Sequence, residues 1–165
     1  MKNANKFPEP DPLSEDEFFA WRGFLRAHAT VTGELDRRLR AQHDLPLSEY
    51  GILITLVGVP GMRLRMGELG RRRLVSPSKI SRAVDELQRQ GFLKRSSDPD
   101  DGRSHFAELT EKGLKKLRTA QLTHHQVVRE LMLARLSERQ LRQMATILEK
   151  AMPGVVSSDV WPKPD

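Results

Sequence analysis

The chain contains no cysteine among its 165 residues. This absence excludes disulfide bonds, thiolate zinc sites and thiol-based redox sensing, and it fits a reducing compartment. Aromatic residues make up only 5% of the chain, so aliphatic side chains must supply most of the core. No apolar run approaches the roughly 20 residues that a membrane helix needs, and the N-terminus lacks a signal-peptide pattern. The sequence therefore predicts a one-domain, cytoplasmic protein that does not contact a membrane.

Positive charge is concentrated in one part of the chain. The whole sequence has a net charge of +6. Residues 62–106 hold 11 Lys or Arg against 6 Asp or Glu, a local charge of +5, whereas the rest holds 17 against 16. A local basic excess attracts polyanions, because phosphates that it neutralises release their counterions. Charge alone leaves open a solvated surface that only keeps the protein soluble.

Periodic apolar residues and capping residues predict a mainly helical chain. We expect helices over about residues 14–42, 48–57, 67–73, 77–90, 111–134 and 138–151, and strands over 63–65, 92–96 and 104–109. The predicted helix starts are Ser14 with Glu17, Ser48, Ser76 before Pro77, Thr110, and Ser137 with Gln140. The first helix has a ring and apolar face at Phe18, Trp21, Leu25, His28, Leu35 and Leu39. That helix is longer than one small domain can cover, so part of its face is expected to pack on a second subunit.

Two of these helices, joined by Leu74-Val75-Ser76, fit a helix-turn-helix. In that motif the second helix enters the major groove of DNA and presents its N-terminal residues to the base edges. This helix carries hydrogen-bonding side chains there, at Ser76, Ser78, Lys79, Ser81 and Arg82. An ordinary amphipathic surface helix is the alternative. The basic hairpin that follows, with Lys94, Arg95 and Arg103, favours binding to double-stranded DNA.

The loop of that hairpin holds a second candidate contact. Arg103 lies two residues after Asp101, a spacing at which a carboxylate can hold and aim a guanidinium. Arginine is also the side chain usually inserted into a narrow minor groove. The alternative is a surface turn with an incidental ion pair, which contributes little.

Three segments together resemble the MarR family of bacterial winged helix-turn-helix transcription regulators. They are Ser76–Gly91, the loop Asp98-Pro99-Asp100-Asp101-Gly102-Arg103, and the run Leu109-Thr110-Glu111-Lys112-Gly113. The resemblance covers roughly residues 14–150. It implies an obligate homodimer built by the terminal helices, a pseudo-palindromic operator, Pro77–Gln90 as recognition helix and Arg103 as the arginine of the wing tip. It also implies that a small organic ligand releases the protein from DNA.

The predicted fold is therefore mainly α with a small β-hairpin wing, in which a winged helix-turn-helix domain joins a helical dimerisation region. Its parts are a flexible segment (residues 1–12), a first dimerisation helix (13–43), the DNA-binding domain (47–110), C-terminal dimerisation helices (111–151) and a flexible tail (152–165). The predicted function is a homodimeric, sequence-specific repressor of transcription. A helical protein-interaction module that docks on an acidic partner is the alternative.

Further sites are less marked in the sequence. A small aromatic or anionic effector would suit a wall of Trp21, Arg22, Arg26, His28 and His43, although core or dimer packing is the more common role for residues placed like Trp21 and His28. His105 and the pair His124-His125 raise zinc as an alternative, but adjacent helical histidines point about 100° apart and do not share one ion easily. We predict no metal and no cofactor. The chain also lacks a glycine-rich phosphate loop and any nucleophile–base motif, so we predict that it is not an enzyme.

Overall fold

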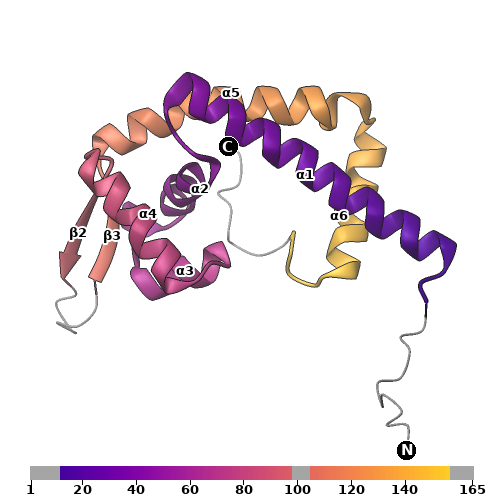
Figure 1. Cartoon of the computed structure of the whole chain (residues 1–165), viewed down its shortest axis with the longest axis horizontal. Helices are drawn as coiled ribbons and strands as arrows, with labels where there is room; N and C mark the ends of the chain where they lie inside the picture. The colour runs from indigo at the N-terminus through magenta and orange to yellow at the C-terminus, as the bar shows by residue number, and fades with distance from the viewer. Residues whose placement is uncertain (1–11, 98–104, 157–165) are drawn as a thin grey trace, which may run out of the picture. The chain divides into compact units, whose positions relative to one another are not determined.

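The computed structural model describes residues 12–97 and 105–156. The chain divides into two compact units, residues 1–30 and residues 31–165. In chain order the elements are α1 (Glu15–His43), α2 (Leu47–Val57), the 3-10 turn η1 (Pro60–Met62), β1 (Arg63–Arg65), α3 (Met66–Arg73), α4 (Pro77–Arg89), β2 (Leu93–Ser97), β3 (His105–Leu109), α5 (Glu111–Leu131), the 3-10 turn η2 (Leu133–Arg135) and α6 (Glu138–Ala151) (Figure 1). This mainly helical order with one small sheet confirms the predicted fold class.

The capping signals explain several of the helix starts. In α1 the Ser14 N–H donates to Glu17 Oε2 at 2.8 Å, and the Glu17 N–H donates to Ser14 Oγ at 3.3 Å. Ser137 and Gln140 form the same reciprocal box at the start of α6. Such caps satisfy backbone donors that have no partner within the helix. Both boxes were predicted from the sequence and are confirmed.

Two other starts differ from the prediction. Helix α2 begins at Leu47 after Pro46, so Ser48 lies inside the helix and does not cap it. Ser76 does occupy the N-cap position of α4, but among the described residues its side chain makes no capping bond, and its Oγ lies 3.3 Å from Ser78 Oγ. At the other end of the chain, α5 stops at Leu131 and the turn η2 follows, where a helix was predicted to Ala134.

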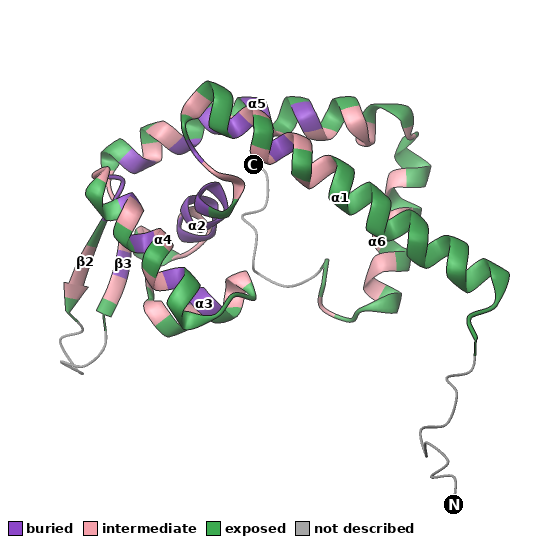
Figure 2. Ribbon diagram, viewed as in Figure 1, coloured by how far each residue is buried: buried purple, intermediate pink, exposed green. Residues whose placement is uncertain are grey.

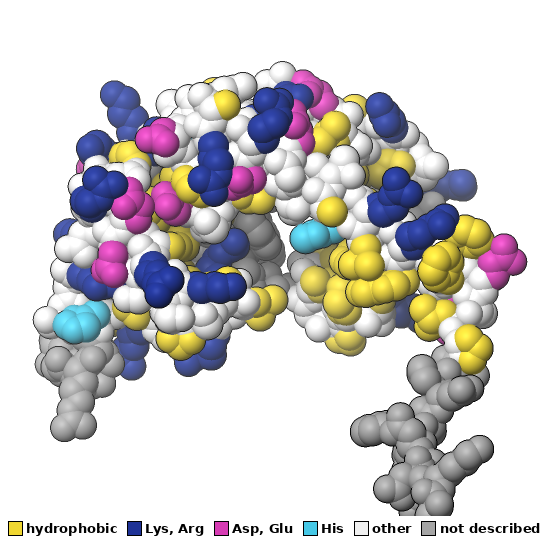
Figure 3. Space-filling view, viewed as in Figure 1, with side chains coloured by type: hydrophobic (Ala, Val, Ile, Leu, Met, Phe, Trp, Pro, Cys, Tyr) yellow, Lys and Arg dark blue, Asp and Glu magenta, His cyan; other side chains and the backbone are white. Residues whose placement is uncertain are grey.

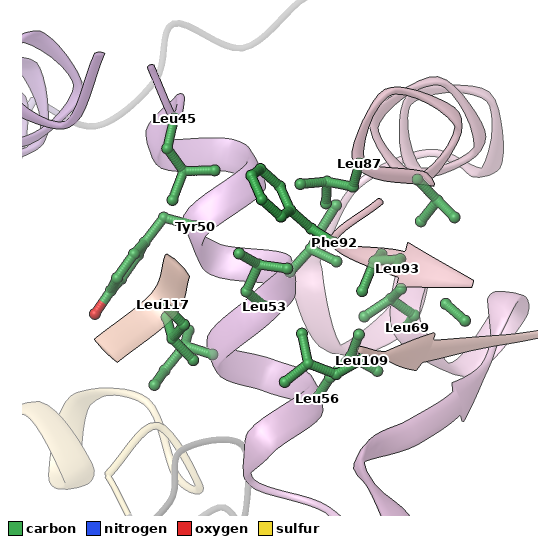
Figure 4. Packing of buried hydrophobic residues seen from close by; sticks show 14 of the residues in the cluster. Leu45, Tyr50, Leu53, Leu56, Leu69, Leu87, Phe92, Leu93, Leu109 and Leu117 are labelled. Atoms are coloured by element: carbon green, nitrogen blue, oxygen red, sulfur yellow. The ribbon is translucent and has the colours of Figure 1, made fainter. Parts of the chain in front are cut away.

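The core of the second unit forms around α2. Every residue from Glu49 to Leu56 is buried, and Leu53 and Leu56 are fully inaccessible to solvent. Figure 4 shows leucines of the other elements converging on this helix, among them Leu69 of α3, Leu87 of α4 and Leu117 of α5. Because α2 is apolar around its whole circumference, the other elements pack on all its sides. Both the helix-turn-helix and the sheet pack against α2.

The sheet has three antiparallel strands in the order β1-β3-β2. Strand β3 lies in the middle and pairs Ala107 with Leu64 of β1 on one side and with Arg95 of β2 on the other. Ala107 and Leu109 are buried and alternate with partly exposed residues, as expected for a strand with one face on the core. The hairpin of β2 and β3 is the predicted wing, and residues 98–104 between the two strands lie outside the described residues.

The wing joins α5 through close contacts at Thr110 and Gly113. Thr110 Oγ1 accepts a hydrogen bond from the Gly113 N–H at 3.0 Å and donates to the Gly91 and Phe92 carbonyl oxygens at 2.8 and 3.0 Å. The Thr110 N–H donates to the same Phe92 carbonyl at 3.1 Å. Gly113 is buried directly against this carbonyl, where a side chain has no room. Thr110 thus both caps α5 and holds the end of β3 to the residues just before β2, so α5 and the base of the wing meet at one joint.

A second joint links α1, α2 and α5 near His124. The His124 ring stacks on Tyr50 with centroids 4.8 Å apart and planes 15° apart, and its Nδ1 is buried without a partner among the described residues. His43 Nε2, at the end of α1, lies 2.8 Å from Oγ1 of Thr123, the residue before His124 on α5. Burial, and then the charge of His125, lowers the pKa of His124 below its usual 6.5. Burial also raises the pKa of Tyr50 to about 12, so both rings are neutral at neutral pH.

Replacement of His124 by phenylalanine is expected to reduce the loss of stability on acidification. Because the folded-state pKa of His124 is lowered, the unfolded chain binds the proton more tightly, and stability is lost as pH falls below about 6.5. Phenylalanine retains a ring against Tyr50 but does not titrate. Urea unfolding of both proteins at about pH 7.5 and about pH 5.5 measures the difference. His43, whose pKa is lowered by burial and by Lys116, and Glu49, whose pKa is raised by burial and by Glu86, are present in both proteins. An equal loss in the two proteins would contradict the role of His124.

Outside this core, two helical surfaces remain exposed. Every residue from 12 to 30 is exposed, although five of the side chains on α1 there are large and apolar (Figure 2). Along the predicted apolar face of α1, Leu35 and Leu39 are buried. None of residues 138–151 in α6, all of which are described, is buried either. Among the described residues, no helix combines the length and apolar character required to cross a bilayer.

Candidate nucleic-acid interface

Helices α3 and α4 are joined by a tight turn. Leu74 adopts the left-handed conformation, with φ 52° and ψ 39°, and its N–H donates to the Arg71 carbonyl at 3.1 Å. The next N–H, of Val75, donates to the Gly70 carbonyl at 3.2 Å. These bonds end α3, and Pro77 at the first turn of α4 starts the second helix with a pre-set φ. The segment therefore has the helix-turn-helix geometry predicted from the sequence.

Helix α4 has a buried side and an exposed side. Ile80, Val84 and Leu87 are buried in the core. The exposed side carries polar and cationic residues near its N-terminus: Ser76, Ser78, Lys79 and Arg82. Within residues 12–97 and 105–156, neither Lys79 nor Arg82 forms an ion pair, so both charges remain available to a ligand. Figure 3 shows Lys and Arg side chains standing over this part of the molecule.

Hollows lie along both flanks of α4. One has a volume of about 730 Å³ and is lined by the turn, with Leu74 and Val75, and by Arg95 and His105 of the sheet. The other, of about 400 Å³, lies between α4 and the start of α2 and reaches Lys79 and Arg82. Because both flanks recede, the N-terminal half of α4 projects. A projecting helix with free cations fits the major groove of B-DNA.

Ser81 and Arg95 are brought together. Arg95 Nη2 lies 3.3 Å from Ser81 Oγ, and Arg95 Nη1 lies 2.9 Å from Asp85 Oδ1. Lys94, the neighbour of Arg95 on β2, is exposed and pairs across the sheet with Glu108 at 2.8 Å. Ser81, Lys94 and Arg95 therefore already have partners on other elements of the chain. The other two candidates of the wing, Asp101 and Arg103, lie outside the described residues.

Comparison with known proteins agrees with this geometry. The family model described as the MarR family matches residues 43–104. Sco3205 from Streptomyces coelicolor, a MarR family transcriptional regulator solved in complex with DNA, is 32% identical, with a TM-score of 0.82 over 88% of this chain and 92% of that one. The chain belongs to the MarR family of transcriptional regulators.

Two curated relatives extend the comparison. YkoM of Bacillus subtilis, an HTH-type transcriptional regulator, is 34% identical over 93 residues, which are 56% of this chain and 58% of YkoM. The chain thus spans little more than half the length of that relative. IacR of Pseudomonas putida, an HTH-type transcriptional repressor, is 25% identical over 146 residues, 86% of this chain and 82% of IacR. The relatives named here are regulators.

Further basic residues, which contribute to the local positive charge but were not predicted as site residues, lie on β1 and α3. Arg63 and Arg65 of β1 lie over the Phe106 ring, 4.8 and 5.8 Å from its centroid. This MarR-family chain also carries three consecutive arginines at the end of α3. Arg71 and Arg72 both bond to Glu68, whereas the Arg73 guanidinium lies against Gly51, where burial lowers its pKa. The alternation of Arg63 and Arg65 on a strand was the one signal that could have placed two of them on a common face.

The candidate effector residues fall in both units. Trp21, Arg22, Arg26 and His28 are exposed on α1 in the first unit. There Trp21 stacks on Phe24 with centroids 6.0 Å apart, and the Arg22 guanidinium lies 5.2 Å from the Phe18 centroid. His43 belongs to the second unit, where it contacts Thr123.

The histidines considered for zinc are not assembled into a ligand set. His124 and His125 meet edge to face, with centroids 5.9 Å apart, and His124 faces Tyr50. His105 lies on β3, exposed at the edge of the larger hollow beside α4. Across the part of the chain that the structure describes, no group of three or more His, Asp or Glu could hold a metal ion.

Proposed function

We propose that this MarR-family protein is a homodimeric repressor that binds a pseudo-palindromic operator in double-stranded DNA. Helix α4 enters the major groove, and the wing contacts the adjacent minor groove. The observation that carries the proposal is the exposed side of α4. Ser76, Ser78, Lys79 and Arg82 project from a helix whose opposite side is fixed in the core by Ile80, Val84 and Leu87. Lysine and arginine can reach guanine edges or phosphates, and serine suits either target.

The relatives support both parts of this proposal. Sco3205, similar over nearly its whole length, was solved in complex with DNA. IacR is a repressor by name, which favours repression over activation here. The predicted contacts of Asp101 and Arg103 at the wing tip are part of the proposal.

The homodimer is supported by apolar surface that a monomer leaves exposed. In the first unit, α1 presents Phe18, Phe19, Trp21, Phe24 and Leu25, each between 44% and 53% exposed. Figure 3 shows hydrophobic side chains gathered along this half of α1. In the second unit, α6 has no buried residue along its described length and exposes Ile147. Contiguous apolar surface of this kind marks an association site, and twofold pairing lets two identical surfaces cover each other.

We also propose that a small aromatic or anionic effector weakens the binding to DNA. Its binding wall lies on the first unit and includes Trp21, Arg22, Arg26 and His28. The stack of Trp21 on Phe24 next to the Arg22 guanidinium is a platform suited to an aromatic carboxylate. An effector that binds the dimer helices acts by changing the spacing of the two recognition helices.

Titration of the protein against labelled DNA from upstream of its own gene tests the proposal. We expect a dimer by analytical sedimentation, and binding that resists excess competitor DNA and weakens linearly with the logarithm of salt concentration. If the protein binds this DNA no more tightly than random DNA, the proposal of an operator there is refuted. That result would favour the alternative function, a helical protein-interaction module that docks on an acidic partner. Aromatic carboxylates added to the complex test the effector. Release that persists in Trp21→Ala would exclude the proposed wall.

A further inference from the structure

We propose that Arg95 and Asp85 form a brace that fixes the wing against the recognition helix α4. Arg95 is then a positioning residue for DNA binding, in place of the direct DNA contact predicted from the sequence. This inference rests on the proposed function, which gives the orientation of wing and helix its importance.

The guanidinium of Arg95 reaches from β2 across to α4. Its Nη1 donates to Asp85 Oδ1 at 2.9 Å. Its Nη2 lies 3.3 Å from Ser81 Oγ and 3.5 Å from the Ser81 carbonyl oxygen. Ser81 and Asp85 are four residues apart and therefore lie on one face of the helix, one turn from each other. The forked side chain thus spans a whole turn of α4, which a single-point contact does not do.

Burial shows that this guanidinium is turned inward. The Arg95 side chain is 30% exposed, and its Nε is buried without a hydrogen-bond partner among the described residues. Successive residues of a strand point to opposite faces, and the adjacent Lys94 is the exposed one, paired with Glu108 on the neighbouring strand. A guanidinium held by an acid on its own chain has little net charge left for a phosphate.

The brace also accounts for the presence of an acidic residue, Asp85, on a helix proposed to bind DNA. Asp85 is 57% exposed on α4 and, by charge alone, repels a nearby polyanion. Its neighbour Glu86 accepts hydrogen bonds from Arg89 and Gln90 at the end of α4, and among the described residues it forms no hydrogen bond or ion pair with the wing. A wing and a helix that enter different grooves must keep a fixed relative orientation to bind together. Asp85 secures that orientation through Arg95.

The decisive experiment compares Asp85→Ala with Glu86→Ala. Both variants remove one negative charge from the same helix, so charge alone predicts slightly tighter binding for both. The brace predicts that Asp85→Ala weakens binding to the upstream DNA by about fivefold, while Glu86→Ala binds as tightly as wild type or more tightly. Equal or tighter binding by Asp85→Ala would overturn the brace.

Arg95→Ala separates positioning from phosphate contact. Loss of the brace lowers affinity by about the same factor at every salt concentration and leaves the wild-type salt slope unchanged. The Asp85→Ala, Arg95→Ala double variant then binds no more weakly than either single variant, because both changes break one interaction. Loss of a phosphate contact instead makes the slope shallower by about one, and that result would reject positioning.

Amide hydrogen exchange of the DNA-free protein tests the brace without the proposed function. We expect faster exchange in β2 and β3 of Asp85→Ala than of Glu86→Ala, because the wing opens more often when it is not held. Equal exchange in the two variants would overturn the brace. If the wild type binds no upstream DNA specifically, the proposed function fails, and the exchange measurement still decides whether Arg95 holds the wing.

Discussion

Replacement of Gly113 by alanine is expected to lower the free energy of unfolding by about 3 kcal/mol. A Cβ at this position would overlap the Phe92 carbonyl oxygen and lie 2.8 Å from Leu109 Cδ1. The carbonyl cannot give way freely, because it accepts hydrogen bonds from both the N–H and the hydroxyl of Thr110. Overpacking therefore also strains the Thr110 cap of α5, and these costs outweigh the gain of about 1 kcal/mol from replacing glycine in a helix. Thermal unfolding should show a midpoint lower by about 10 °C.

Gly70→Ala is the matched control for this prediction. Gly70 is also a buried helical glycine, but a Cβ there would lie 3.5 Å from the Val75 carbonyl oxygen and 3.7 Å from Ile80 Cγ1, which are ordinary contacts. We expect this variant to be as stable as wild type or more stable by up to about 1 kcal/mol. The two proteins must be compared at one concentration, since the proposed dimer would make stability depend on it. Similar stabilities of Gly113→Ala and Gly70→Ala would show that the backbone at Phe92 shifts to accommodate a Cβ at little cost in free energy.

Local signals in the sequence sufficed for the elements of the fold. The boxes at Ser14–Glu17 and Ser137–Gln140 need only residues three apart, and both occur as predicted. The buried stripe of α4 follows from apolar spacing at Ile80, Val84 and Leu87. The prediction failed at Ser48, where the reason is only partly local. Pro46 provides an extended backbone before Leu47, and the Leu47 N–H donates to Asp36 Oδ1 of α1 at 2.9 Å, so α2 starts one residue earlier without a serine cap.

Contacts between elements were beyond the reach of such signals. From the sequence, Arg95 could only be predicted as one of several cations in the hairpin. Its ion pair with Asp85 depends on how β2 packs against α4, which the sequence pattern does not show. The requirement for glycine at position 113 likewise comes from contact with Phe92, which lies 21 positions earlier in the chain. The Leu-Thr-x-x-Gly run marked the family resemblance, but its physical cause is the close approach of α5 to the wing. Tertiary packing, which periodicity does not encode, decides both cases.

Replacement of Lys79 or Arg82 by alanine is expected to weaken operator binding by about 1–3 kcal/mol each, roughly fivefold to more than a hundredfold. Both side chains are exposed on the projecting half of α4, and neither is neutralised within the described residues. A base contact lowers affinity mainly for the operator, whereas a phosphate contact lowers it for all DNA and reduces the salt slope by about one. Titrations against operator and random DNA at several salt concentrations therefore assign each residue to one of the two roles.

Lys115→Ala and Arg118→Ala provide matched controls, because they remove the same charges from exposed positions on α5. A general attraction between a basic protein and DNA predicts similar small losses for all four variants. Recognition by α4 predicts a large loss for Lys79→Ala and Arg82→Ala alone, with unfolding midpoints close to wild type, since neither side chain packs in the core. Equal effects of the α4 and α5 variants would mean that the +5 charge of residues 62–106 acts only as a diffuse field. The recognition helix would then have to be sought elsewhere on the molecule.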